Sequence, residues 1–386
     1  MCWRHQPFSF YSDEMPDLAN RDPEYLKQTL TRWFATQLPE SAEPLCSEVS
    51  APGGNGFSNE TIMATVSWTE DGVRSAHKKV LRVHPTSHTL FLDARFELQY
   101  KVMAAVAASS AKIPLPVLGA YETDLDYLGV PFFVMDHVEG QVPADNLPYT
   151  MDGEGWVLQA TDEERQRLWW SGLDALAEIA KIDHTTLGLD FLDRPEYGKA
   201  GIDQQLGYYR AFLDASSGGR PQPTTEAIWT WLLENRPATE GPLGFSWGDA
   251  RIGNIIWDNF QPAAVVDWEM ASFAPAEIDL GWFLYFNRQF TEGLGLPPLP
   301  GFASREASID RFETAIGRSV HDLEWFEVFA GFRFGVIMLR LTDLLIGSGV
   351  LPADTDMGTN NLATQFTSML LGLPSPAEMD AAAKNA

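Results

Sequence analysis

The chain has little cysteine and little positive charge. Only two of its 386 residues are cysteine, Cys2 and Cys46, so no disulfide framework is expected and a reducing compartment fits this composition. Lys and Arg number 27 against 53 Asp and Glu, which gives a formal net charge of −26. Nucleic acids and anionic membranes are bound through clustered basic residues. The composition therefore argues against both kinds of partner.

The sequence also lacks a signal segment and a long uninterrupted apolar run. Its first residues, MCWRH, show no basic-then-apolar pattern. The most apolar late stretch, 326–346, is interrupted by Arg333, Arg340 and Asp343, and a membrane span rarely tolerates so many charges. We therefore expect a cytoplasmic protein in which this stretch is a buried helix. A hydrophobic content of 45% predicts a globular chain. At 386 residues the chain is long enough for two lobes.

What is present is a set of polar residues around two short apolar runs. Residues 255–257 and 263–266 have the pattern of two strands of a hairpin, with a turn at 258–262. Asn254 directly precedes the first strand and Asp267 directly follows the second. Because these two ends are adjacent in an antiparallel pair, an amide oxygen and a carboxylate converge there. Such hard oxygen ligands predict a Mg²⁺ site that is completed by waters and substrate phosphates.

Asp249 precedes Asn254 by the Asp-x-x-x-x-Asn spacing of a kinase catalytic loop. In that loop the Asp accepts the proton of the attacking hydroxyl group and the Asn holds the metal. We expect Arg251 to place positive charge against the transferred phosphoryl group. Glu269, two residues after Asp267, is a candidate second metal ligand or a carboxylate that faces the substrate. Each acidic residue alone would be unremarkable, but together they predict a site of phosphoryl transfer.

Three segments carry a resemblance to a known family: WGDARIGN at 247–254, VVDWE at 265–269 and AEIDLGW at 276–282. They resemble the aminoglycoside phosphotransferase/choline kinase-like family, and within it a branch related to domains found with acyl-CoA dehydrogenases. The resemblance runs from about Gly53 to about Asn287. It implies an α+β chain with a two-lobe protein-kinase-like fold, in which the N-lobe has a mostly antiparallel sheet and the C-lobe is mainly helical.

The resemblance to this family raises one difference, at Trp247, and one expected contact, at Asp279. The family usually has His-Gly-Asp where this chain has Trp247-Gly-Asp. The His braces the loop in relatives, so the geometry of the loop is left open here. The resemblance also implies that Asp279 accepts backbone N–H groups of the catalytic loop; an ordinary first-turn carboxylate is the alternative.

A glycine-rich segment, PGGNGFSN at 52–59, precedes two β-rich runs at 61–69 and 76–83. Kinase-like N-lobes use such a turn to lay backbone N–H groups over phosphates, and an ordinary hairpin loop is the alternative. The predicted nucleotide contacts within this segment are Gly54, Ser58 and Asn59.

The second of these runs contains the predicted phosphate-binding cation. Alternation puts Val80 and Arg82 on one face of the strand. The resemblance selects Arg82 for the nucleotide phosphates and Glu97, on a helix at 91–108, as its partner. A solvated arginine at the strand end and a surface pair between Glu97 and Lys101 are the alternatives.

The lobe boundary is predicted from a strand pattern at 132–138 and from the hinge that follows it. Residues 132–138 read as a strand that leads into a hinge, where the resemblance implies adenine contacts by the backbone of Asp136 and Val138. We expect an N-terminal nucleotide-binding lobe at 1–139 and a helical lobe at 140–386. Helices are expected at 22–37, 91–108, 161–182, 204–215, 225–234, 276–287, 304–316, 322–346 and 358–371.

The sequence thus predicts a kinase that moves the γ-phosphoryl group of ATP or GTP to a hydroxyl group of a small molecule, with Mg²⁺ and with Asp249 as the base. A non-catalytic, pseudokinase-like nucleotide-binding module is the alternative, because Trp247 and the missing strand lysine are departures that such modules often carry. A hydrolase with Asp249 and Glu269 as paired carboxylates would explain neither Asn254 nor the glycine-rich segment. A protein kinase is disfavoured because no activation segment with an Ala-Pro-Glu end follows Asp267.

The identity of the acceptor is predicted only by class. Aminoglycosides are polycations, which need several convergent carboxylates. The helix at 322–346 instead carries many aromatic residues, with Arg333 and Arg340 seven positions apart. Most of its apolar residues are expected in the core. A partly apolar or anionic hydroxyl compound is therefore expected at least as much as an antibiotic.

Overall fold

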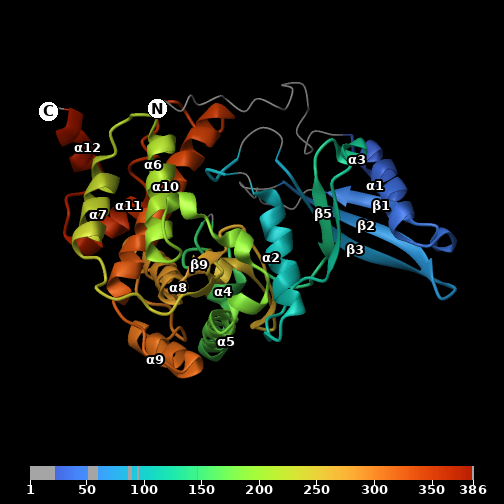
Figure 1. Cartoon of the computed structure of the whole chain (residues 1–386), viewed down its shortest axis with the longest axis horizontal. Helices are drawn as coiled ribbons and strands as arrows, with labels where there is room; N and C mark the ends of the chain where they lie inside the picture. The colour runs from blue at the N-terminus through green and yellow to red at the C-terminus, as the bar shows by residue number, and fades with distance from the viewer. Residues whose placement is uncertain (1–21, 51–59, 86–88, 94, 146, 385–386) are drawn as a thin grey trace. The chain divides into compact units, whose positions relative to one another are not determined.

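The computed structural model describes residues 22–50, 60–85, 89–93, 95–145 and 147–384. They form two compact units (Figure 1). The first contains the residues up to Thr89 together with Val117–His137, and the second contains Leu90–Pro116 and the residues from Val138 onward. Leu90–Pro116 belongs to the second unit, whereas the sequence predicts an N-terminal lobe at 1–139 that includes this segment. The lobe division after residue 139 remains a proposal.

The first unit contains an antiparallel sheet whose described strands follow the order β1-β2-β3-β5-β4. Strands β2 and β3 form the predicted hairpin, and the turn between them is Asp71-Gly72. Both turn residues have positive φ, at 49° and 76°, which is what a two-residue hairpin turn requires. The strands are β1 (Leu45–Ser50), β2 (Glu60–Glu70), β3 (Val73–Val83), β4 (Leu118–Glu122) and β5 (Phe132–Asp136).

One face of this sheet packs against helix α1 (Pro23–Gln37), which Asp22 caps by accepting a hydrogen bond from the backbone N–H of Glu24. Leu81 and Val83 are fully buried in the core, so the alternation of β3 puts Val80 and Arg82 on the opposite face, as predicted. The short helices of this unit are η2 (Glu40–Ala42) and α3 (Leu125–Leu128), and its core contains Leu30, Trp33, Phe34, Ile62, Ala64, Val66, Trp68, Leu81 and Val83.

The second unit is mainly helical and is built around α10 (Leu323–Gly347), which packs against α8 (Glu277–Gln289), α6, α7 and α11 (Figure 1). Helix α5 (Asp162–Ala180) begins with the capping box of Thr161 and Glu164. Among the described residues, no helix combines the length and apolarity needed to cross a membrane. The other α-helices are α2 (Phe96–Ala108), α4 (Trp156–Gln159), α6 (Ile202–Ser217), α7 (Pro223–Glu234), α9 (Arg305–Ile316), α11 (Leu362–Leu371) and α12 (Pro376–Lys384). The 3₁₀ helices are η3 (His184–Thr186), η4 (Asp190–Leu192), η5 (Pro195–Tyr197), η6 (Ile252–Asn254) and η7 (Glu292–Leu294).

Two small antiparallel pairs frame the segment with the predicted catalytic residues. Strand β6 (Gly244–Ser246) pairs with β9 (Ser272–Ala274), and the predicted hairpin is formed by β7 (Ile255–Asp258) and β8 (Gln261–Val265). The predicted five-residue turn is wrong: the strands continue closer to the bend, and only Asn259 and Phe260 lie between them. Both have left-handed φ, at 47° and 60°, which is the requirement of a two-residue turn.

Phe260 is an unusual residue for this left-handed position, and its neighbours hold it there. Its ring lies 5.6 Å from that of Trp156, and its carbonyl oxygen accepts a hydrogen bond of 3.3 Å from the hydroxyl group of Ser171. These contacts offset the backbone strain of a bulky residue at positive φ. The hairpin is therefore attached to helices α4 and α5 through its turn.

Candidate active site

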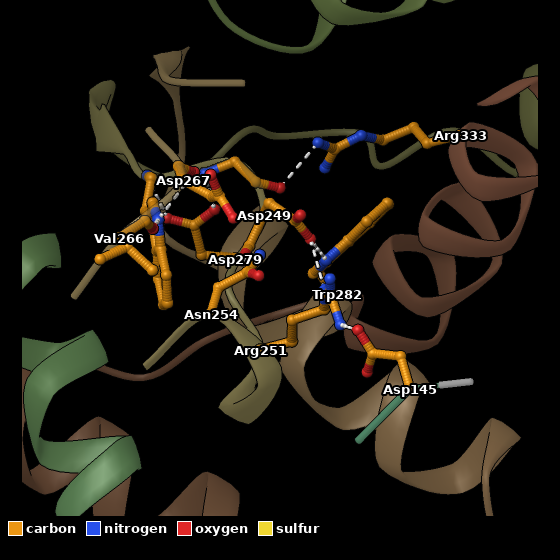
Figure 2. A network of polar contacts seen from close by, with 11 residues as sticks. Asp145, Asp249, Arg251, Asn254, Val266, Asp267, Asp279, Trp282 and Arg333 are labelled. Carbon is orange, nitrogen blue, oxygen red and sulfur yellow. Dashed lines mark hydrogen bonds and ion pairs between the residues drawn. The ribbon is translucent and has the colours of Figure 1, made fainter. Parts of the chain in front are cut away.

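The loop between β6 and β7 carries Asp249, Arg251 and Asn254, and Asp279 of α8 anchors its start (Figure 2). One carboxylate oxygen of Asp279 accepts hydrogen bonds from the hydroxyl group of Ser246 and the backbone N–H of Gly248, at 2.7 and 2.9 Å. The other accepts from the backbone N–H of Trp247 at 2.7 Å. This confirms that Asp279 accepts backbone N–H groups of the loop. Burial raises the pKa of this carboxyl group, against the opposing effect of its hydrogen bonds and of Arg333.

Gly248 gives the loop a conformation that no other residue fits. Its φ is +91°, and a Cβ atom at this position would lie 2.1 Å from the carbonyl oxygen of Met270. A side chain would therefore push the loop away from the Met270 backbone. On the other side, Nη2 of Arg333 donates a hydrogen bond of 2.9 Å to the carbonyl oxygen of Gly248. The residue before Asp249 is thus held from two directions.

The carboxylate of Asp249 is held through one oxygen. Its Oδ1 accepts a hydrogen bond of 2.8 Å from Nε1 of Trp282 and one of 3.1 Å from Nε of Arg251. Figure 2 shows both donors meeting this oxygen. Arg251 also forms an ion pair with Asp145. Burial acts to lower the pKa of Arg251, but Asp249 and Asp145 outweigh it and raise that pKa.

The sequence does not predict the contacts of Trp282 and Asp145 in this site, and it predicts a different role for Arg333. Trp282 lies in the AEIDLGW segment, but nothing in its spacing indicates a contact with Asp249. Asp145 lies in the connector before α4, where an acidic residue is ordinary. The sequence offers Arg333 as a reason to expect an anionic substrate, but this residue is 1% exposed and its guanidinium group donates to the backbone of the loop that carries Asp249. Its burial against Trp282 of α8 removes that argument.

The hairpin brings Asn254 and Asp267 to adjacent positions. The backbone N–H of Val266 donates a hydrogen bond of 3.0 Å to the carbonyl oxygen of Asn254, so Asp267 is the next residue along. The side-chain amide of Asn254 donates to the carbonyl oxygen of Asp249 at 3.0 Å. This bond uses the nitrogen of the amide and leaves its oxygen available as a metal ligand. Glu269 lies two residues beyond Asp267, and its role remains a prediction.

Trp247 holds the backbone at Asp267. Its indole Nε1 donates to the carbonyl oxygens of Val266 and Asp267, at 3.0 and 3.2 Å. Asp267 has a left-handed φ of 56°, which costs conformational energy for a residue other than glycine. The tryptophan that replaces the expected histidine is therefore in contact with the backbone of the predicted metal ligand.

In the described part of the chain, four buried indole groups donate hydrogen bonds around this loop and hairpin. Besides Trp247 and Trp282, Nε1 of Trp257 donates to the carbonyl oxygen of Ile252 at 3.0 Å, and Nε1 of Trp268 donates to that of Val265 at 3.1 Å. Each of the four side chains is at most 2% exposed. Only Trp282 among them donates to a carboxylate. A sequence signal exists for three of them, because each segment that carries the family resemblance contains one tryptophan, Trp247, Trp268 or Trp282.

The described residues offer an oxygen-only donor set for a metal. No three His, Cys, Asp or Glu side chains gather there in a metal-binding arrangement. The predicted set is instead the carboxylate of Asp267 and the amide oxygen of Asn254. Mg²⁺ prefers oxygen ligands and keeps several waters or substrate phosphates. The donor chemistry therefore fits Mg²⁺ bound together with a nucleotide.

The predicted nucleotide contacts are dispersed over both units. Gly54, Ser58 and Asn59 lie outside the described residues. In the first unit, Nη1 of Arg82 donates to the hydroxyl oxygen of Thr61 at 3.1 Å. In the second unit, Glu97 pairs with Lys101 at 2.8 Å, which is the surface pair considered as an alternative. Because Arg82 and Glu97 belong to different units, their pairing remains a prediction.

The hinge prediction also spans the division between the units. Asp136 belongs to the first unit, where its side chain pairs with Lys79 and its backbone N–H donates to the carbonyl oxygen of Val117 at 2.9 Å. That N–H group is already used within the sheet. Val138 is the first residue of the second segment of the other unit. Their contacts with adenine remain predictions.

Comparisons with known proteins agree with this architecture. A Ralstonia eutropha protein, a proposed aminoglycoside phosphotransferase, superposes with a TM-score of 0.62 and 18% identity over 90% of this chain and 99% of that one. The GDP and kanamycin complex of APH(2″)-IIIa gives a TM-score of 0.54 and 13% identity over 90% and 99% of the two chains. At these identities the likeness shows the fold alone, which is the predicted two-lobe protein-kinase-like α+β fold.

The model of the phosphotransferase enzyme family (APH) matches residues 52–313. This chain belongs to that family. In sequence it is also similar to a probable acyl-CoA dehydrogenase, IBR3, of Arabidopsis thaliana, with 26% identity over 242 residues, or 59% of this chain and 27% of that protein. The chain thus spans about a quarter of the length of the curated relatives that it matches. The similarity confirms the predicted branch, which is related to domains found with acyl-CoA dehydrogenases.

Proposed function

We propose that the chain transfers the terminal phosphoryl group of ATP or GTP to a hydroxyl group of a small molecule in a Mg²⁺-dependent reaction. The observation that supports this proposal most directly is the position of Asp249. Its carboxylate is held by two N–H donors, and the same loop carries Asn254, which is adjacent to Asp267 across the hairpin. Base and metal ligands are thus joined in one framework, as phosphoryl transfer requires.

Asp249 is the proposed base. Since Trp282 and Arg251 both donate to Oδ1, the oxygen Oδ2 is left to accept a hydrogen bond from the acceptor hydroxyl group. In a loose transition state the hydroxyl proton leaves late, so the carboxylate first orients the nucleophile and then takes its proton. Arg251 is proposed to supply positive charge near the transferred group, although its ion pairs with Asp249 and Asp145 already engage part of its guanidinium.

Asn254 and Asp267 are the proposed metal ligands, with Glu269 as a third candidate. Bound Mg²⁺ would offset the negative charge of the nucleotide phosphates. The protein's own contribution is orientation: the Asn254 amide is fixed by the carbonyl oxygen of Asp249, and the Asp267 backbone is fixed by Trp247. The ligands are thereby held in place before the nucleotide binds.

Nucleotide binding is supported by the family and by a solved neighbour, APH(2″)-IIIa, that contains GDP. Whether ATP or GTP is preferred is part of the test. The residues proposed to contact or support the nucleotide are Gly54, Ser58, Asn59, Arg82, Glu97, Asp136 and Val138.

The surroundings of Asp249 favour a partly apolar acceptor. The guanidinium group of Arg251 lies 5.5 Å from the ring centroid of Phe286. That ring lies 4.8 Å from Phe334 and 4.9 Å from Trp282. A polycation such as an aminoglycoside would be better matched by several carboxylates than by this aromatic cluster. We therefore propose a hydroxylated small molecule with an apolar part.

An unbiased phosphorylation screen tests the proposal. The purified chain is incubated with MgATP or MgGTP and pools of hydroxylated metabolites, with kanamycin as a comparison compound, and phosphorylated products are identified by mass spectrometry. Asp249→Asn and Asp267→Asn serve as inactive controls. Product formation that both substitutions abolish is the expected result. If the wild type binds nucleotide, measured as thermal stabilisation, but phosphorylates nothing, the non-catalytic module is the better description.

A further inference from the structure

We propose that Trp282 is a positioning residue for Asp249. Together with the buried Arg333 behind it, its indole N–H holds Oδ1 of the carboxylate and thereby presents Oδ2 to the acceptor hydroxyl group. This inference rests on the proposed function, because it takes Asp249 as the base.

The first observation is the way in which both donors meet the same oxygen. Nε1 of Trp282 lies 2.8 Å from Oδ1 of Asp249, and Nε of Arg251 lies 3.1 Å from it. Within the described ranges, no residue donates a hydrogen bond to Oδ2. A carboxylate held through one oxygen by two N–H groups cannot rotate freely about its Cβ–Cγ bond. The other oxygen therefore has a defined direction before any substrate arrives.

The second observation is that the indole group of Trp282 is fixed by its place on helix α8. Trp282 is 1% exposed, and it is on the same helix, α8, as Asp279, which accepts the backbone N–H groups of Trp247 and Gly248. One helix thus holds both the backbone of the catalytic loop and the side chain of its base. A shift of α8 would move the two together and preserve their relative positions.

The third observation is the cation behind the indole ring. The guanidinium carbon of Arg333 lies 4.3 Å from the centroid of the Trp282 ring and 5.1 Å from that of Tyr209. Its Nε and Nη1 atoms are buried without a hydrogen-bond partner, and its Nη2 atom donates to a carbonyl oxygen, so no carboxylate of the described residues is hydrogen-bonded to it. Such a charge is costly to bury. The aromatic faces, the carbonyl oxygen of Gly248 and the negative charge of Asp279 offset part of that cost.

The location of this cation has a chemical consequence for the indole group. A positive charge over an aromatic face draws electron density toward itself and polarises the ring N–H, which makes it a stronger donor. Figure 2 shows Arg333 reaching toward the loop from α10 while Trp282 points toward Asp249. Arg333 therefore supports Asp249 in two ways, through the ring of Trp282 and through the backbone of Gly248.

The kinetic test compares Trp282→Phe with Trp325→Phe. The first substitution keeps an aromatic face for Arg333 but removes the N–H group. The second removes an equally buried indole N–H, which donates to the carbonyl oxygen of Leu232 away from the loop. We expect kcat for ADP formation from MgATP, with water as the acceptor, to fall about tenfold in Trp282→Phe, with KM for MgATP changed less than about twofold. Trp325→Phe should retain wild-type kcat. A Trp282→Phe enzyme with near wild-type kcat, or one altered only in KM, would overturn the inference.

A spectroscopic test separates this inference from the proposed function, because it needs no turnover. The indole N–H resonance of Trp282, assigned by its loss in Trp282→Phe, should move when Asp249 is changed to Asn, since the carboxylate partner becomes a neutral amide. The Trp325 resonance should stay in place. A Trp282 resonance that does not respond to Asp249→Asn would overturn the contact, whether or not an acceptor is known.

Two further variants test the donor and the cation individually. Replacement of Trp282 by β-(3-benzothienyl)alanine keeps the ring shape and puts sulfur in place of the N–H group, so it should reproduce the loss of kcat seen with Phe. Wild-type kcat in this variant would show that shape, and not donation, matters. Arg333→Met should also move the Trp282 resonance toward that of an unpolarised indole. An unchanged resonance would remove Arg333 from the proposal.

Discussion

The indole nitrogen of Trp247 lies 3.2 Å from the carbonyl oxygen of Asp267, a residue whose backbone is left-handed with a φ of 56°. The same N–H group lies 3.0 Å from the carbonyl oxygen of Val266. One donor thus contacts the two peptide groups that orient the proposed metal ligand. Trp247 stands where the family usually has histidine, and its ring N–H holds the backbone at the end of the hairpin. The replacement therefore leaves this part of the loop with a hydrogen-bond donor.

Trp247→Phe should weaken the response to Mg²⁺. The phenyl ring fills most of the space but donates no hydrogen bond, so the backbone of Asp267 loses the contact that offsets its strain. We expect turnover to fall about tenfold at limiting Mg²⁺ and to recover in part at high Mg²⁺. Turnover measured as a function of Mg²⁺ concentration checks this. Trp169→Phe is the matched control, since its buried indole donates to the hydroxyl group of Ser308; equal effects of the two variants would contradict the prediction.

Asp249→Asn and Asp267→Asn should have separable effects. The first keeps the shape of the base but cannot accept the proton, so turnover should fall by a factor of about 10²–10⁴ with nearly unchanged nucleotide affinity. The second removes a negative metal ligand, so turnover and Mg²⁺-dependent nucleotide affinity should both fall. Steady-state kinetics combined with calorimetry of nucleotide binding distinguishes the two. Near-normal turnover in Asp249→Asn would exclude this residue as the base.

Arg82→Ala should weaken nucleotide binding by about 1–3 kcal/mol, the range for loss of a charge-assisted contact. The side chain lies on the face of β3 opposite the core, and its described bond is to the hydroxyl group of Thr61. Arg74→Ala is a suitable control, because Arg74 is on the same strand but donates to the carbonyl oxygen of Glu43 near the other end. Calorimetry that finds the same affinity in Arg82→Ala and Arg74→Ala would refute the role of Arg82.

Asp279→Ala should lower the free energy of unfolding by about 3 kcal/mol or more, because a buried hydroxyl group and two backbone N–H groups lose their acceptor. Chemical denaturation measures this loss. Asp174→Ala is the control, since Asp174 pairs with Arg311 at the surface and exposed pairs contribute about 0–1 kcal/mol. A loss for Asp279→Ala as small as that of the control would show that the loop does not depend on this anchor.

Local patterns in the sequence were sufficient for much of the fold. The helix at 161–182 was predicted from local helix signals, and strands β2 and β3 were predicted from the β-rich runs at 61–69 and 76–83. Both depend on residues close together in the chain. Helix α12, at Pro376–Lys384, was not among the predicted helices. Strands β6 and β9 were missed because each has three residues, too few to show a period.

In the candidate site, too, contacts between residues close in sequence were predictable and contacts between distant residues were not. The positions of Asp249, Asn254 and Asp267 follow from short spacings along one loop and one hairpin. The partners of Asp249 do not, since Trp282 is 33 residues away in sequence. Asp145, which pairs with Arg251, is 106 residues from it. Such contacts arise from the packing of whole helices, for which a single sequence contains no local signal.

The three hydrogen bonds to Asp279 also determine how the loop between β6 and β7 opens. The amide protons of Trp247 and Gly248 point at a carboxylate in the first turn of α8, so they meet solvent only when the loop and the helix separate. Their exchange with deuterium should therefore be as slow as that of the amides within α8. A segment that connects two short strands would then belong to the same cooperative unit as a buried helix, and would unfold with it.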